Sequence, residues 1–195
     1  MTHRENAMTI QILTGAVAST QRVLQNVPPG ALGGKTPCSE WTVADLINHV
    51  VGTATFFADL AEDTGTEDGE AGDAAAGDFL AAFDHQTSRL LAAFSRPGVM
   101  DRVMMLPPGP EPGSVCSWVA AGEIFAHGWD LAAATGQDTA LDWRIAEALL
   151  ASPWRGLCDL VRSEPVPPIG PALEVPDAAP AADRLAGFLG RAKLA

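Results

Sequence analysis

The chain lacks the features that mark membrane, secreted and nucleic-acid-binding proteins. No stretch reaches the roughly 18 consecutive apolar residues of a membrane-spanning helix, and the start, MTHRENAMTI, lacks the apolar segment of a secretion signal. Only 12 basic side chains stand against 24 acidic ones, which gives a formal net charge of −12, and no Lys/Arg run could follow a phosphate backbone. We therefore expect a cytoplasmic protein that binds neither nucleic acid nor anionic membranes.

Cysteine is also scarce. Cys38, Cys116 and Cys158 are widely spaced and form no C-x-x-C pair, so neither a disulfide framework nor a zinc ribbon is indicated. The chain contains no G-x-S-x-G motif, no P-loop and no dinucleotide-binding fingerprint. Lysine is nearly absent, whereas Arg, Ala, Gly and Pro are abundant, a composition that a GC-rich bacterial genome encodes.

What the chain does contain is a helical pattern of apolar residues. At 195 residues and 47% hydrophobic content it can form one domain with a core. Apolar residues near the 3.6-residue period predict helices over 8–26, 42–61, 78–95 and 115–135. Thr42 is the expected N-cap of the second helix, with Asp45 three residues on, and Ser114 that of the fourth.

The remaining segments are less regular. Residues 63–77 are expected to form a polar loop, 99–106 a short strand or extended piece, and 107–113 (PPGPEPG) a break. A fifth helix, 143–161, is interrupted by Pro153, prolines make 165–180 an extended tail, and a short helix follows at 181–191. Without a convincing pair of strands, this pattern predicts an all-α antiparallel bundle. We expect a single domain over 1–195, with a core at 8–161 and a tail at 162–195.

Three residues form a candidate site for a metal ion. Glu123 and His127 are four residues apart on the fourth predicted helix, so both side chains leave the same face, and Asp130 continues that stripe. His49 borders the apolar arc of the second helix and can face the interior. Two imidazoles and one carboxylate would leave coordination positions open, as catalytic metal sites do. Each residue also has an ordinary interpretation. Glu123 and His127 could be a surface pair, and His49 a hydrogen-bonded core histidine. Asp130 could be a solvated carboxylate or one that orients a ligand.

Other polar and aromatic residues give weaker signals. His85 is expected on the surface. Trp41, Trp118 and Trp129 are expected in the core or in a pocket wall, with the core favoured. Four arginines could recognise a substrate carboxylate, and none is assigned to a site: Arg89, Arg102, Arg144 and Arg155.

Three segments carry a family resemblance. TPCSEWTVADLINHVVG (36–52), EIFAHGWDLAAATG (123–136) and VPDAAPAADRLAGFLGR (175–191) together resemble the DinB-like superfamily, and within it the branch of the N-terminal domain of mycothiol-dependent maleylpyruvate isomerase. The resemblance implies an up-down-down-up four-helix bundle that holds one divalent metal through His49, Glu123 and His127. Zinc is the first expectation, and nickel, iron or cobalt also suit these donors.

The resemblance also implies a function. Glutamate at position 123 favours the isomerase and mycothiol-transferase side of the superfamily, so we expect a metal-dependent thiol transferase or isomerase that acts on a small electrophile, with mycothiol as cosubstrate. The complete isomerase carries a further C-terminal domain, and here only a tail follows the bundle, which argues against maleylpyruvate itself as the substrate. The alternatives are a lyase, hydrolase or cyclase that uses no thiol, and a non-catalytic metal-binding bundle. A monomer or a homodimer is expected.

Overall fold

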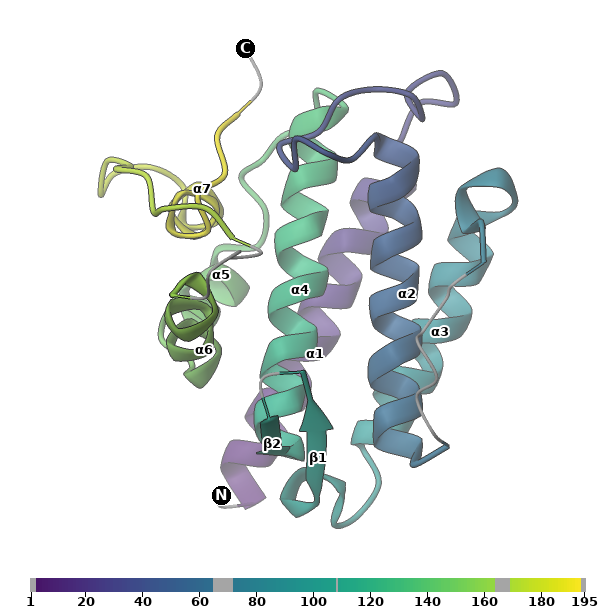
Figure 1. Ribbon diagram of the computed structural model, residues 1–195, viewed down its shortest axis with the longest axis vertical. Coiled ribbons are helices and arrows are strands. Elements are labelled where there is room, and N and C mark those ends of the chain that lie inside the picture. The colour runs from purple at the N-terminus through teal and green to yellow at the C-terminus, as the bar shows by residue number, and fades with distance from the viewer. Residues whose placement is uncertain (1–2, 65–71, 108, 164–168, 194–195) are drawn as a thin grey trace.

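A computed structural model describes residues 3–64, 72–107, 109–163 and 169–193 (Figure 1). Within these residues the chain is mostly helical, with two single-turn 3₁₀ helices and one small sheet. The elements in order are α1 (His3–Leu24), α2 (Val43–Glu62), η1 (Ala74–Ala76), α3 (Phe79–Phe94), η2 (Val99–Asp101), β1 (Val103–Leu106), β2 (Gly109–Pro112), α4 (Gly113–Ala134), α5 (Trp143–Leu150), α6 (Pro153–Arg162) and α7 (Ala181–Phe188).

The four long helices form an up-down-down-up bundle, with α2 and α4 in front of α3 and α1 in the view of Figure 1. Helices α1 and α4 run parallel, because Thr20 near the end of α1 donates to the carbonyl of Ile124, and Gln137 after α4 donates to that of Val23. Helix α2 is parallel to α3 and antiparallel to α4. The predicted all-α bundle is therefore confirmed.

Glycine lets two of these helices approach closely. A Cβ atom added to Gly128 on α4 would lie 2.3 Å from the hydroxyl oxygen of Thr20 on α1. Below about 3 Å, such atoms overlap and one of the helices would have to move. The small residue thus sets the spacing of α1 and α4 one residue beyond His127.

The start of α2 follows the sequence prediction, and the start of α4 does not. Thr42 caps α2: its side chain accepts from the backbone N–H of Asp45, whose carboxylate accepts from the N–H of Thr42, a complete capping box. Ser114, the expected cap of the fourth helix, lies inside α4 instead, which begins at Gly113 after Pro112 with no side-chain cap. Gly113 is required there, because an added Cβ would lie 2.1 Å from the carbonyl oxygen of Val99.

The segment before α4 corrects another prediction. Residues 107–113 were expected to break regular structure, but 109–112 pair antiparallel with β1, so that Met105 lies opposite Pro110 and Leu106 opposite Gly109. Proline is tolerated because a two-stranded ribbon leaves outward-facing positions that need no N–H donor. Arg102 joins the ribbon to the bundle by donating to the last carbonyls of α2, at Leu60 and Ala61.

A short C-terminal layer covers one side of α4 (Figure 1). Pro153 divides the predicted fifth helix into α5 and α6, as a proline at the first turn of a helix would. Of the predicted tail, residues 169–180 are irregular as expected, and α7 ends at Phe188 rather than 191. Residues 65–71 of the predicted loop and 164–168 of the tail lie outside the described residues.

Two contacts attach this layer to α4. Trp129 donates from its indole nitrogen to Asp183 of α7. Trp154 of α6 packs over Gly122, where an added Cβ would lie 2.3 Å from the indole ring. Both contacts lie within a turn or two of Glu123 and His127, so the layer is fixed beside the candidate site. Among the described helices, none combines the length and the apolar character that crossing a membrane requires.

Candidate metal centre

The three residues predicted as ligands lie together between α2 and α4. One donor atom from each of His49, Glu123 and His127 lies within 4.8 Å of the other two. Nε2 of His127 is 3.5 Å from Oε2 of Glu123, and the two imidazole rings meet edge to face with their centroids 4.6 Å apart. Because α2 and α4 are antiparallel neighbours, residues 74 positions apart in sequence converge on one point.

Asp130 holds the His127 ring from the side away from Glu123. This fully buried carboxylate accepts a hydrogen bond from Nδ1 of His127 at 3.0 Å. The bond fixes the ring's orientation and directs Nε2 toward Glu123. Histidine ligands in metal sites are commonly oriented by a carboxylate in this way. Of the two interpretations of Asp130 made from sequence, the geometry matches the orienting carboxylate.

The protonation states suit a cation. Burial and the nearby His127 lower the pKa of His49 to about 4, so its imidazole is neutral at pH 7 with a lone pair available. Burial alone would raise the pKa of the Glu123 carboxyl, but the hydrogen bond and charge of His127 outweigh it and lower the pKa. The pKa of the Asp130 carboxyl is also lowered, because the hydrogen bond and charge of His127 outweigh the effect of burial. His49 and Glu123 therefore offer a neutral nitrogen and a carboxylate oxygen without competition from protons.

His127 differs from His49. Burial would lower its pKa, but hydrogen bonds to Asp130, Cys38 and Glu123 raise it well above its usual value. Without a cation, the imidazolium is stabilised between the two carboxylates. A metal ion at Nε2 would have to displace that proton, so binding at this residue releases a proton.

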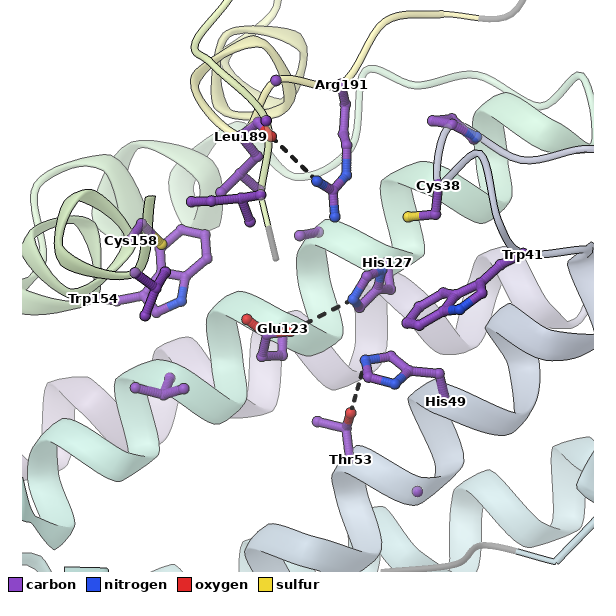
Figure 2. A pocket seen from close by; sticks show the side chains of 18 of the residues that line it. Cys38, Trp41, His49, Thr53, Glu123, His127, Trp154, Cys158, Leu189 and Arg191 are labelled. Carbon is purple, nitrogen blue, oxygen red and sulfur yellow. Dashed lines mark hydrogen bonds and ion pairs between the residues drawn. The ribbon is translucent and has the colours of Figure 1, made fainter. Parts of the chain in front are cut away.

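The candidate site opens into a cavity of about 1190 Å³. Figure 2 shows His49, Glu123 and His127 pointing into it from two helices, with Trp41 beside both histidines and Trp154 on the opposite side. The Trp41 ring lies 4.5 Å from that of His49, centroid to centroid. Trp41 thus forms a pocket wall, whereas Trp118 and Trp129 are buried in the core, the location favoured from sequence.

Two residues of the cavity were not singled out from sequence. Arg191 follows α7, is largely buried, and points toward His127 (Figure 2). Its Nε is 3.5 Å from Oδ2 of Asp130. The thiol of Cys38 lies 3.4 Å from the same oxygen. Neither residue is part of a helical period in the sequence. The only sequence signal for them is that Cys38 lies in the 36–52 segment and Arg191 in the 175–191 segment.

The arginines considered from sequence are held elsewhere. Arg89 pairs with Asp59 and Glu62 on α2, and Arg102 binds the end of that helix. Arg144 stacks on Trp143, and Arg155 lies over Phe188. His85 is exposed on α3, as expected.

The donors present fit a divalent metal. His49, Glu123 and His127 supply two nitrogens and one oxygen, a set that zinc and other first-row metals accept. A second group, Cys38, His127 and Asp130, also brings three donors within 4.8 Å. In this second group the Arg191 guanidinium already lies beside Asp130, and its positive charge would repel a metal ion there. The first group is the better candidate.

Comparisons with known proteins place the chain in a family. Residues 13–132 match the family model described as Mycothiol maleylpyruvate isomerase N-terminal domain. Uncharacterized protein Rv0738 of Mycobacterium tuberculosis strain H37Rv is 40% identical over 175 residues, covering 87% of this chain and 90% of that relative. Uncharacterized protein MT0763 of strain CDC 1551 matches equally.

Solved structures share the fold. The crystal structure of the mycothiol-dependent maleylpyruvate isomerase superimposes with a TM-score of 0.60 and 18% identity, over 78% of this chain and 72% of that chain. A histidine-to-alanine mutant of that enzyme gives a TM-score of 0.59 at 16% identity, with the same coverage. At such identity the likeness establishes the architecture of the bundle.

Proposed function

The chain belongs to the mycothiol maleylpyruvate isomerase N-terminal domain family, and we propose from this premise that it is a divalent-metal-dependent enzyme with mycothiol as cosubstrate. The reaction is the transfer of the thiol to a small electrophile, or the thiol-assisted isomerisation of one. The metal ligands are His49, Glu123 and His127, and zinc is the first candidate for the ion.

One observation carries this proposal: the three donors face a cavity of about 1190 Å³. A structural metal site is closed by protein ligands on all sides, whereas a catalytic one keeps a position open for substrate. Three donors beside a cavity of this size match the catalytic arrangement. This favours an enzyme over a bundle in which the ion only joins two helices.

The charged side chains around His127 favour an anionic ligand. Glu123 and Asp130 are carboxylates and Arg191 is a guanidinium, so these groups sum to a charge of −1. A bound dication would bring the sum to +1, which a thiolate would neutralise. When bound, such an ion lowers the pKa of a coordinated thiol, so that the thiolate forms at neutral pH.

The protein's own residues would position the reactants. Asp130 keeps His127 in one orientation through the bond to Nδ1. Arg191 presents a guanidinium to the cavity, where it can bind a carboxylate of the thiol or of the electrophile. Trp41 and Trp154 form apolar walls on opposite sides of the metal ligands.

The test combines metal analysis with thiol binding. Purified protein should contain one equivalent of divalent metal by elemental analysis and should bind mycothiol in isothermal titration. His49→Ala should lose both. His85→Ala is the matched control, because this histidine is exposed on α3, and it should keep both.

Each component of the proposal can fail separately. Wild-type protein without stoichiometric metal, or His49→Ala protein that keeps it, would refute the metal site. Stoichiometric metal without mycothiol binding at millimolar thiol would refute the thiol chemistry and favour an enzyme that activates water or a substrate oxygen.

A further inference from the structure

We propose that the cavity contains a separate apolar arm that binds an elongated hydrocarbon body of the electrophile. The inference rests on the proposed function, because it concerns the second reactant at the same site. The arm is the part of the cavity between α2, α4 and α6 that extends from Glu123 toward β1. Its walls are Phe56, Phe57, Leu106, Pro107, Val119 and Leu157.

Helix geometry gives the arm its direction. On α2, Phe56 lies seven residues after His49, about two turns or roughly 10 Å along the axis. On α4, Val119 lies one turn before Glu123. Because the two helices are antiparallel, both side chains lie on the same side of the metal ligands, toward Leu106 at the end of β1. The arm is therefore about two helical turns deep.

Helix α6 closes the arm on its third side. Trp154 packs against Gly122, where a side chain of any size would collide with the indole ring. This contact holds α6 close enough for Leu157 and Val161, one and two turns further along, to line the same cavity. The close approach that glycine allows at position 122 thus gives the groove between α2 and α4 a third wall.

The two ends of the cavity differ in chemistry. Arg191, Cys38, Glu40 and Asn48 line the end near the start of α2, where a hydrophilic thiol finds polar partners. Apart from Thr53, the walls of the arm carry carbon side chains, and Phe56, Val119 and Leu157 are only half-buried. A small dicarboxylic acid would leave these surfaces in contact with water, whereas an alkyl or aryl body would cover them.

A conjugate addition tests the arm. With mycothiol and 2-alkenals, the thiol sulfur bonds to the β-carbon, the electron pair of the carbon–carbon double bond moves to the α-carbon, and that carbon takes up the thiol proton. The series from crotonaldehyde to 2-decenal lengthens only the apolar end. Each buried methylene should raise kcat/KM roughly fourfold until the arm is full.

Variants connect the effect to the arm. Leu157→Gln places a polar group in the wall and should flatten the chain-length series, whereas Val119→Phe should fill the arm and reject only the long members. Leu160→Gln is the matched control, since Leu160 lies on the same helix with its side chain exposed, and it should keep the wild-type series.

Binding separates this inference from the proposed function. Saturated n-alkanols, which cannot react, are titrated into metal-loaded protein by calorimetry, and their Kd should fall roughly fourfold per methylene. Length-dependent binding without turnover of any alkenal would refute the thiol chemistry and keep the arm. Turnover or binding that is independent of chain length, or a Leu157→Gln series equal to that of Leu160→Gln, would overturn the arm.

Discussion

Replacing Asp130 with asparagine tests how the candidate metal centre is held. Asparagine keeps the volume of this fully buried side chain and removes its charge, so the hydrogen bond from Nδ1 of His127 at 3.0 Å loses its carboxylate partner. Loss of such an orienting carboxylate typically lowers metal affinity roughly 10- to 100-fold, or about 1.4 to 2.8 kcal/mol. The lost negative charge near a cation acts in the same direction.

The same variant changes the proton balance. In metal-free protein, Asp130 is the strongest of the groups that raise the pKa of His127, so the wild type keeps an imidazolium there to higher pH than usual. Metal binding should then release more protons from the wild type than from Asp130→Asn. Competition with a chromophoric chelator gives the affinities, and calorimetry in buffers of different ionisation enthalpy gives the proton count.

The control is Asp159→Asn, which removes an exposed carboxylate paired with Arg162 on α6 and should leave both quantities unchanged. A folded Asp130→Asn protein with wild-type affinity and proton release would refute the role assigned to this carboxylate.

Three further predictions concern packing, pH and the alternative donors. Gly122→Ala should destabilise the protein by about 1–3 kcal/mol in urea unfolding, because the new methyl overlaps Trp154. Gly156→Ala on α6 is the control: its added methyl has no atom within 4 Å, so this variant should be stabilised instead. In metal-free protein the raised pKa of His127 stabilises the fold below about pH 6.5, and this contribution is lost as pH rises through the raised pKa. As pH rises above about 6.5, the free energy of unfolding of the wild type should therefore fall relative to that of His127→Gln. Parallel plots of unfolding free energy against pH for the two proteins would contradict the raised pKa of His127. Cys38→Ser should keep its full metal content by elemental analysis. Loss of the metal from this variant would assign the ion to the group of Cys38, His127 and Asp130.

Features that depend on a single helix could be predicted from the sequence. The capping box of Thr42 and Asp45 involves residues three apart, and the shared face of Glu123 and His127 follows from helical geometry alone. His49 required only its phase on the second helix, plus the resemblance to a family. Such features depend on interactions within one helix, which a pattern can express.

Features that leave no helical period in the sequence could not be predicted. Arg191 reaches the site because Gly190 adopts a positive φ of 78° and turns the chain back after α7. The pairing of β2 with β1 is set by the hairpin, although Pro110 and Pro112 have low strand propensity. Neither feature leaves a period in the sequence, so only the folded chain reveals them.

We expect the thiol of mycothiol to bind the metal held by His49, Glu123 and His127. X-ray absorption at the zinc edge measures this directly, on zinc-loaded Cys38→Ser protein so that the nearest cysteine cannot contribute sulfur. Without mycothiol the account predicts only nitrogen and oxygen neighbours, at about 2.0–2.2 Å, and with mycothiol one additional sulfur at about 2.3 Å. A spectrum that mycothiol leaves unchanged at saturating concentration would contradict it.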